Sequence, residues 1–193
     1  AEMLAETGYV AFAADMYGEA KMTRKPEEAS DWMQLVVSDV AGWQRRANLA
    51  LEQLRSHPKV DAEKLAAIGY SFGGATVMQR AYSGADLDGV VSVYGSLPPA
   101  TPEQAAQVKG RVLIAHGDAD NFVPADRMQA FKQALSDANV DWEMDVYGGA
   151  GHAFANPYAD GYGVAGVAYQ EQADRRSWLR VLAFLEELFE EAL

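Results

Sequence analysis

Short apolar runs alternate along the chain with longer segments whose apolar residues recur every three or four positions. A short apolar run is typical of a strand buried on both faces, and the longer spacing is that of one helical face. Strands are predicted at five places, residues 9–14, 65–70, 89–94, 111–116 and 142–147. This alternation predicts an α/β fold, with a mostly parallel sheet and helices on both of its faces.

Helices are predicted between these strands and after the last one. The first begins at Pro26, places apolar residues from Val36 to Leu54 on one face, and ends at His57-Pro58. The others are expected from Gly73-Gly74 to near Gly84, from Pro124 to about Ala138, and in a C-terminal segment with apolar residues from Trp178 to Phe189, which follows a glycine-rich loop at 148–166. Ligands in such folds bind at the carboxyl ends of the strands, so chemistry is expected there.

Length and composition narrow the class of protein. The 193 residues suit a single domain, 1–193, and 49% hydrophobic residues are too many for a disordered chain. The 16 Lys+Arg against 28 Asp+Glu give a net charge of −12, which argues against nucleic acid or an anionic membrane as partner. The chain has no cysteine, which excludes disulfides, thiolate metal sites and a cysteine nucleophile.

A candidate nucleophile, Ser71, follows the second predicted strand within Gly69-Tyr70-Ser71-Phe72-Gly73. In a G-x-S-x-G turn the serine sits on a tight, strained bend between strand and helix, and both residues two positions away must be small. The helix that follows directs its positive end and the N–H of Phe72 toward an oxyanion. The alternative is a glycine-rich turn without function, but the strand before it and the helix after it favour the nucleophile.

A serine hydroxyl needs a base, and the chain has three histidines. His57 precedes a proline at a helix end and is expected to be solvated, whereas His116 ends a strand and is expected to be buried and structural. His152 lies in a glycine-rich loop after the last strand, which allows the loop to fold over a cleft. We therefore expect His152 to be the general base.

The third member of such a triad is an acid that fixes the histidine tautomer. Asp118 and Asp120 both follow the fourth strand, and spacing alone does not choose between them. Either acid gives the chain order Ser, Asp, His, which is the order of the α/β-hydrolase fold.

Four motifs then resemble the dienelactone hydrolase family of α/β hydrolases, in order and over essentially the whole chain. They are Asp15-Met16-Tyr17-Gly18, Gly69-Tyr70-Ser71-Phe72-Gly73-Gly74, Gly117-Asp118-Ala119-Asp120-Asn121-Phe122-Val123-Pro124 and Gly151-His152-Ala153-Phe154-Ala155-Asn156-Pro157. The resemblance implies that Asp120, just before the x-x-V-P stretch, is the triad acid. It also implies that Tyr17 lines the substrate pocket. Tyr70, Phe72, Phe122 and Phe154 adjoin the catalytic positions and are candidates for pocket walls or, alternatively, for ordinary core packing.

The chain departs from the family pattern at the nucleophile and at the substrate-binding charges. The name-giving enzymes carry cysteine where this chain has Ser71, so this looks like an esterase variant that depends more on its base. Family members specific for dienelactone use arginines to hold a substrate carboxylate, and this chain has Asn156 at one such position and Glu19 in the loop after Tyr17. Neutral short-chain esters or lactones fit these residues better.

The family's N-terminal strands, and the loop that supplies a second oxyanion N–H, have no counterpart in this sequence. A sheet without a central strand would leave backbone groups unpaired, so we expect either a fragment of a longer product or a homodimer that fills the gap by swapping. No apolar run reaches the roughly 18 residues of a membrane span. A cytoplasmic location is expected, with a secreted or periplasmic one as the alternative.

The sequence thus predicts a carboxylesterase or lactonase that acts on a small ester through an acyl-enzyme, with Ser71, His152 and Asp120 as its triad. No cofactor or metal is implied, because the sequence carries neither a phosphate-binding glycine motif nor paired histidine ligands. Two alternatives are an inactive, ligand-binding remnant of the fold and a serine peptidase-like domain.

Overall fold

The computed structural model describes residues 1–189, and it consists of two compact units divided in sequence between Leu65 and Ala66. The C-terminal unit is built on four parallel strands, each paired with the next along the chain. They are β1 (Ala66–Tyr70), β2 (Gly89–Val93), β3 (Arg111–Gly117) and β4 (Trp142–Tyr147). The order is the one expected when each strand is followed by a crossover helix.

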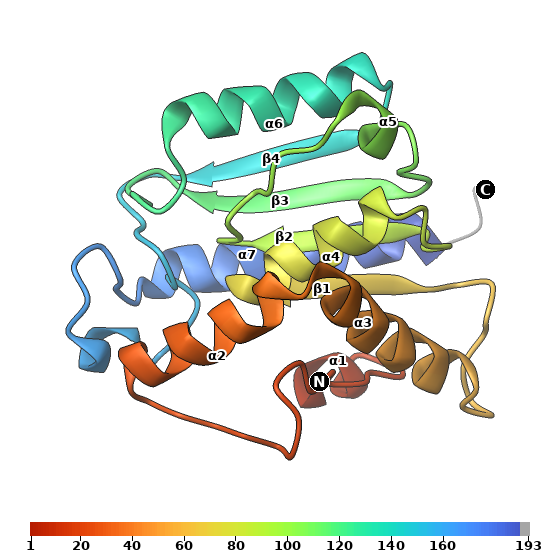
Figure 1. The fold of residues 1–193 in the computed structure, drawn as a ribbon, viewed down its shortest axis with the longest axis horizontal. Helices are drawn as coiled ribbons and strands as arrows, with labels where there is room; N and C mark the ends of the chain where they lie inside the picture. Colours follow the sequence, from red (N-terminus) through yellow and green to blue (C-terminus); the bar gives the residue numbers. More distant parts are fainter. Residues whose placement is uncertain (190–193) are drawn as a thin grey trace. The chain divides into compact units, whose positions relative to one another are not determined.

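Helices cover both faces of this sheet. They are α4 (Phe72–Tyr82), α5 (Pro102–Ala105), α6 (Ala125–Asp137) and α7 (Glu171–Phe189), with a short 3₁₀ helix, η1, at Ala159–Tyr162. Gly74 of α4 lies against Ser92, whereas Gly89 lies against Phe184 of α7. Residues 89 and 92 point to opposite faces of β2 because side chains alternate along a strand. Figure 1 accordingly shows α4 in front of the sheet and α7 behind it.

The core of the C-terminal unit lies between the sheet and these helices. All five residues of β2 are buried. Val91, Leu113 and Ile114 are completely shielded from solvent, as is Met78 of α4, and Phe131 of α6 is 1% exposed. A central parallel strand has no solvent face, so a continuous apolar run suits it. This packing fixes the strand ends from which the candidate site is built.

The predicted second to fifth strands and the helices between them are confirmed, with bounds within a few residues of those expected. The short helix α5 and the 3₁₀ helix η1 were not predicted. Helix α5 begins with a capping box in which the side chains of Thr101 and Gln104 each accept from the other's backbone N–H.

The first predicted strand is wrong, since residues 9–14 form no strand. Val10 and Phe12 in this run are 41% and 49% exposed. A strand is defined by hydrogen bonds to a neighbouring strand, and an apolar run supplies none of these by itself. The sheet in the described residues therefore has four strands rather than the five that were expected.

The N-terminal unit is helical, with α1 (Glu2–Glu6), α2 (Pro26–Ser38) and α3 (Val40–Arg55). Pro26 begins α2 as predicted, but the expected single helical face is interrupted at Asp39. The Asp39 side chain accepts a hydrogen bond from the backbone N–H of Gly42 at 2.8 Å, and so caps α3. Aspartate competes for nearby N–H groups and favours a new helix start over helix continuation.

The loop after residue 14 is organised by Asp15. Its carboxylate accepts hydrogen bonds from the N–H groups of Tyr17 at 3.1 Å, Gly18 at 2.7 Å and Ala20 at 2.8 Å. The bonds from Ala20 and Gly18 are the main reason why the pKa of Asp15 lies below its usual value. None of the helices within residues 1–189 combines the length and apolarity needed to cross a membrane.

Candidate active site

Ser71 sits on the bend between β1 and α4, as the G-x-S-x-G pattern predicted. Its backbone has φ 52° and ψ −114°, a conformation that side-chain-bearing residues rarely adopt. The Ser71 N–H donates to the carbonyl of Val93 at the end of β2, 3.0 Å away. The strained bend is therefore tied to the neighbouring strand, and Phe72 is the first residue of the helix that follows.

The glycines around Ser71 are not equally constrained. A Cβ at Gly69 would collide with the backbone carbonyl of Gly73, and one at Gly74 would collide with the Ser92 hydroxyl. A Cβ at Gly73 would meet nothing within 4 Å. The expectation that Gly69 must be small is thus confirmed, whereas for Gly73 it is wrong. The bend brings the carbonyl of Gly73 against Gly69, but the position of a Cβ on Gly73 faces open space.

Ser71, His152 and Asp120 form one continuous hydrogen-bonded line. The Ser71 Oγ lies 2.8 Å from His152 Nε2, and His152 Nδ1 lies 2.9 Å from Asp120 Oδ2. The second carboxylate oxygen of Asp120 accepts from the Phe122 N–H at 2.9 Å. The Asp120 side chain is completely buried, and that of His152 is 14% exposed. A buried carboxylate with both oxygens engaged suits the orientation of an imidazole.

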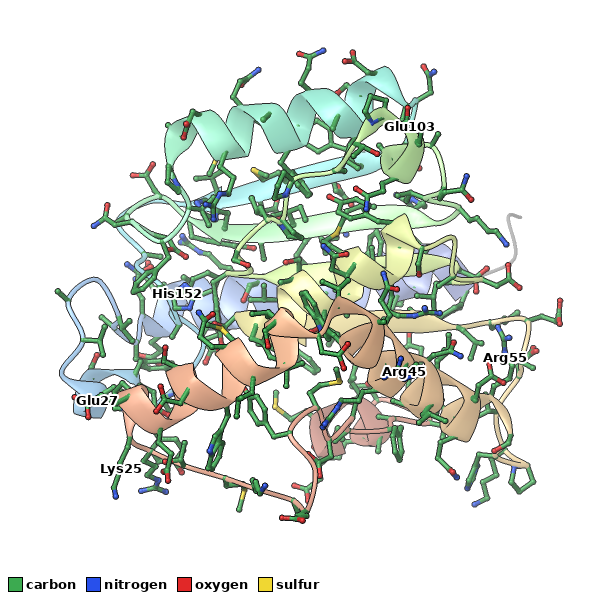
Figure 2. The ribbon with its side chains drawn as sticks, viewed as in Figure 1. Lys25, Glu27, Arg45, Arg55, Glu103 and His152 are labelled. Atoms are coloured by element: carbon green, nitrogen blue, oxygen red, sulfur yellow. The ribbon has the colours of Figure 1, made fainter. Side chains whose placement is uncertain are left out.

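All three side chains come from the carboxyl ends of strands. Ser71 follows β1, Asp120 follows β3 and His152 follows β4. Figure 2 labels His152 at the end of the sheet toward which the arrowheads of β3 and β4 point in Figure 1. Parallel strands bring their carboxyl ends to a single edge, which is how residues 81 positions apart come within hydrogen-bond distance.

The loop that carries His152 is held by the segment just before α7. The His152 N–H donates to Gly166 at 2.8 Å, and the His152 carbonyl accepts from Ala168 at 3.1 Å. The two stretches pair as an isolated parallel bridge between His152 and Val167. A Cβ at Gly151 would lie 2.6 Å from the Gly166 carbonyl, so glycine allows this close approach. The sequence did not indicate this pairing.

The remaining candidates for base and acid lie outside this line. His57 is exposed at the end of α3 in the N-terminal unit, and Asp118 is exposed beside Asp120. His116 is 2% exposed on β3, and burial holds its pKa below the usual value despite the nearby carboxylates of Asp120 and Asp118. The Nδ1 atom of His116 has no hydrogen-bond partner among the described residues.

The predicted pocket residues occupy different environments. The Phe122 ring lies 4.7 Å from the His152 ring, and the Phe122 side chain is 46% exposed. Tyr70 is 41% exposed at the end of β1. Phe154 is completely buried, with its ring centroid 5.1 Å from that of Tyr94. A role in substrate binding for these side chains stays a prediction.

Two further residues singled out by the sequence, Tyr17 and Asn156, have local contacts of their own. Tyr17 belongs to the N-terminal unit, where its ring lies 5.7 Å from that of Trp32. Asn156, at the position where the family resemblance implied an arginine, donates from its side-chain amide to the Tyr162 hydroxyl at 3.1 Å. Within residues 1–189, no three His, Asp or Glu side chains are arranged to hold a metal ion.

Tyr94 belongs to the same cluster, and sequence reasoning missed it. Its ring lies 5.4 Å from that of His152 in an edge-to-face arrangement, and the residue is 5% exposed. Tyr94 directly follows β2, so its position at the carboxyl end of a strand was the available signal. The prediction had instead assigned Tyr94 to the strand itself.

Comparison with known proteins agrees with this architecture. The chain matches the sequence profile of the Dienelactone hydrolase family over residues 1–189. An uncharacterised Caenorhabditis elegans protein is 34% identical over 149 residues, which span 75% of this chain and 92% of that protein. A Yersinia pestis protein that carries the provisional name carboxymethylenebutenolidase is 28% identical over 188 residues, or 93% of this chain and 68% of its own length.

A solved structure is similar as well. The crystal structure of a dienelactone hydrolase-like promiscuous phosphotriesterase from metagenomic libraries superposes with a TM-score of 0.93 and 38% identity, covering 97% of this chain and 78% of that one. The resemblance inferred from the four motifs is confirmed. The chain belongs to the dienelactone hydrolase family, with the α/β-hydrolase fold, and is a carboxylic ester hydrolase.

Proposed function

We propose that this chain hydrolyses small neutral esters or lactones through a covalent acyl-enzyme on Ser71. The observation that carries the proposal is the line of hydrogen bonds from the Ser71 hydroxyl through His152 to the buried carboxylate of Asp120. A serine hydroxyl is a weak nucleophile by itself, and an adjacent base is what makes it react at neutral pH.

The first half-reaction forms the acyl-enzyme. Ser71 Oγ attacks the ester carbonyl carbon while His152 Nε2, 2.8 Å away, takes the hydroxyl proton. The carbonyl oxygen becomes an oxyanion beside the N–H of Phe72 at the start of α4. When the tetrahedral intermediate collapses, the bond to the alcohol breaks, and the imidazolium returns its proton to the departing alkoxide.

The second half-reaction uses the same groups on water. His152 takes a proton from water, and the resulting hydroxide attacks the acyl carbon on Ser71. The tetrahedral intermediate then breaks its bond to the Ser71 oxygen and releases the carboxylic acid, while the His152 imidazolium returns its proton to that oxygen. Throughout the cycle the Asp120 carboxylate accepts a hydrogen bond from the His152 Nδ1–H, 2.9 Å away, and this keeps Nε2 directed toward Ser71. Its charge also stabilises the imidazolium formed in each half-reaction.

The charges around the site support a neutral substrate over a carboxylate-bearing one. Asn156 supplies a neutral amide that is already hydrogen-bonded to Tyr162. Burial, and then the negative charge of Asp174, raises the pKa of Tyr70 beside Ser71. Asp174 accepts a hydrogen bond from the Tyr169 hydroxyl at 3.0 Å. A carboxylate whose charge acts on Tyr70 in this way disfavours an anionic substrate beside Tyr70.

The test measures hydrolysis of p-nitrophenyl acetate and butyrate by the wild type beside Ser71→Ala. We expect turnover in the wild type and a loss of about 10⁴-fold or more in the variant, with a Ser71 adduct of the acyl mass seen after rapid quenching. The matched control is Ser30→Ala, which changes an exposed serine in α2 and should leave the rate unchanged. Turnover that survives in Ser71→Ala would refute the nucleophile.

A substrate series tests the charge preference separately. A butyrate ester, its carboxylate-bearing hemisuccinate analogue and an ammonium-bearing analogue should rank with the anionic ester lowest in kcat/KM. Asp174→Asn should narrow the difference between the neutral and the anionic ester. An anionic ester hydrolysed as fast as the neutral one would contradict the preference while leaving the triad intact.

Phosphotriester hydrolysis is a second candidate, favoured by the 38% identity to the dienelactone hydrolase-like promiscuous phosphotriesterase. Attack of Ser71 on a phosphotriester would release one alcohol and leave a dialkylphosphoryl group on the serine oxygen. Incubation with diethyl p-nitrophenyl phosphate distinguishes the outcomes. Sustained p-nitrophenol release indicates catalysis, whereas one equivalent per chain with a stable adduct indicates inhibition.

The two remaining alternatives have their own tests. Hydrolysis of an ester but not of the matching anilide would indicate an esterase rather than a peptidase-like activity. A ligand that protects the chain against unfolding without being turned over would indicate a binding remnant.

A further inference from the structure

Tyr94 has a backbone conformation that its sequence does not favour. It is an aromatic residue with φ 40°, in the left-handed region that bulky side chains avoid. Its N–H donates to the Ala115 carbonyl of β3 at 2.8 Å, so the strained backbone is fixed by the adjacent strand. Strain of this kind persists where the surrounding structure imposes it, and it is concentrated at functional sites.

The strained backbone brings the Tyr94 ring to the centre of an aromatic cluster. The ring centroids of Tyr94 and His152 are 5.4 Å apart with the planes at 68°, an edge-to-face contact. The Tyr94 ring also meets Phe154 at 5.1 Å and Tyr70 at 5.7 Å. Phe122 contacts the His152 ring at 4.7 Å. The imidazole is thus bounded by two aromatic rings in addition to its two hydrogen bonds.

We propose that Tyr94 is a positioning residue for His152, holding the imidazole plane so that Nε2 faces Ser71 while Nδ1 faces Asp120. This inference rests on the proposed function, in which His152 is the base. During the reaction the Nε2 proton passes between Ser71, the leaving group and water, so the hydrogen bond on that side is repeatedly broken. The ring contact with Tyr94 remains, since it depends on shape rather than on protonation.

The ring of Tyr94, rather than its hydroxyl, performs this role. The neighbouring rings of His152, Phe154 and Tyr70 all contact the Tyr94 ring. Burial raises the pKa of the Tyr94 phenol well above its usual value, so the hydroxyl stays neutral and carries no charge to the site. Phenylalanine at this position should therefore preserve the function, and an aliphatic residue should not.

The experiment compares Tyr94→Phe with Tyr94→Leu, using p-nitrophenyl butyrate and expressing kcat per active serine counted by a fluorophosphonate label. Tyr94→Leu should lower kcat about 10- to 100-fold with KM changed less than about 3-fold, because a small misplacement of a catalytic group has effects of this size. Tyr94→Phe should stay within about 3-fold of wild type. Tyr94→Met, whose unbranched and flexible side chain fills irregular space better, replaces Tyr94→Leu if that variant does not fold.

The matched control is Tyr82→Leu. Tyr82 is a buried tyrosine of α4 that is 3% exposed, and its hydroxyl donates to Pro98. Loss of this ring should lower stability without changing kcat per active serine. Equal losses of kcat in Tyr94→Phe and Tyr94→Leu, or an unchanged kcat in Tyr94→Leu, would overturn the proposal.

A second measurement does not depend on turnover, and it separates this proposal from the proposed function. The His152 Nδ1 proton shared with Asp120 should give a downfield proton NMR signal in wild type and Tyr94→Phe, and none in His152→Gln. The signal should broaden or vanish in Tyr94→Leu. If wild type lacks Ser71-dependent turnover, the proposed function fails, and this signal alone decides the role of Tyr94. An undiminished signal in Tyr94→Leu rejects it.

Discussion

Residues 9–14 and residues 89–93 are both apolar runs of the kind that predicts a buried strand, but only the second forms one. The 89–93 run lies between β1 and β3, pairs with both, and is buried at every position. The 9–14 run forms no strand and leaves Phe12 49% exposed. An apolar run expresses a tendency toward burial, whereas a strand also needs backbone partners on a neighbouring segment.

The same contrast extends to the two units. The largest fully buried side chains, among them Phe131, Phe154 and Phe184, belong to the C-terminal unit. The N-terminal unit buries Val36, Trp43 and Leu65 among its apolar side chains. The Ser71–His152–Asp120 line lies in the densely packed unit, where strained backbone such as that of Ser71 can be held in place.

The largest expected effect tests whether activity depends on His152 of the C-terminal unit and not on His57 of the N-terminal unit. His152→Gln removes the proposed base and should lower kcat/KM for p-nitrophenyl butyrate by about 10⁴-fold or more, because triad members act as a unit. His57→Gln changes an exposed histidine of the N-terminal unit and should leave the rate near wild type. Similar losses of kcat/KM in the two variants would contradict the assignment of His152 as the base.

The second prediction concerns two aspartates that are two positions apart. Asp120→Asn should lower kcat about 10³- to 10⁴-fold, since an amide favours the wrong histidine tautomer. Asp118→Asn should change kcat less than about 3-fold, because Asp118 is exposed and is not bonded to His152. Steady-state kinetics of the two purified variants measures both effects. A larger loss of kcat in Asp118→Asn than in Asp120→Asn would show that Asp118, and not Asp120, is the triad acid.

The third prediction compares how much a buried leucine of the C-terminal unit and an exposed leucine of the N-terminal unit contribute to stability. Leu113→Ala, in the fully buried centre of β3, should lower the free energy of unfolding by about 2–5 kcal/mol. Leu49→Ala changes a side chain of α3 that is 69% exposed and should alter it by at most about 0.5 kcal/mol. Urea unfolding followed by circular dichroism measures the unfolding free energy of both variants. Comparable losses would show that the Leu49 side chain contributes as much to stability as the buried Leu113 side chain, and would contradict the prediction.

The smallest effect is a pH dependence from His116. Burial lowers its folded-state pKa below the ordinary 6.5, so the unfolded chain binds more protons than the folded one as the pH falls through that value. This contribution destabilises the fold progressively below about pH 6.5 and is absent above it. His116→Gln should therefore show a shallower loss of unfolding free energy between pH 7 and 5 than wild type. If the unfolding free energies of wild type and His116→Gln fell equally between pH 7 and 5, His116 would not be the source of this pH dependence.

Predictions from sequence succeeded where a pattern encodes a local requirement. Gly69 is small because the bend brings the Gly73 carbonyl against it, and Pro26 begins a helix because proline suits the first turn. They failed where the outcome depends on distant partners, as at residues 9–14, or on a local competitor such as the Asp39 cap. The choice between Asp118 and Asp120 came from family resemblance, because the spacing fits both.

By itself the sequence determined the alternation of strands and helices from residue 65 onward, the bend at Ser71, and the order serine, acid, histidine. These follow from periodicity and turn chemistry, which act over a few residues. Only the tertiary structure decided that Asp120 Oδ2 meets His152, that residues 166–168 hold the His152 loop, and that Tyr94 packs against its ring. Those contacts join strand ends far apart in sequence, and packing of the whole sheet fixes them.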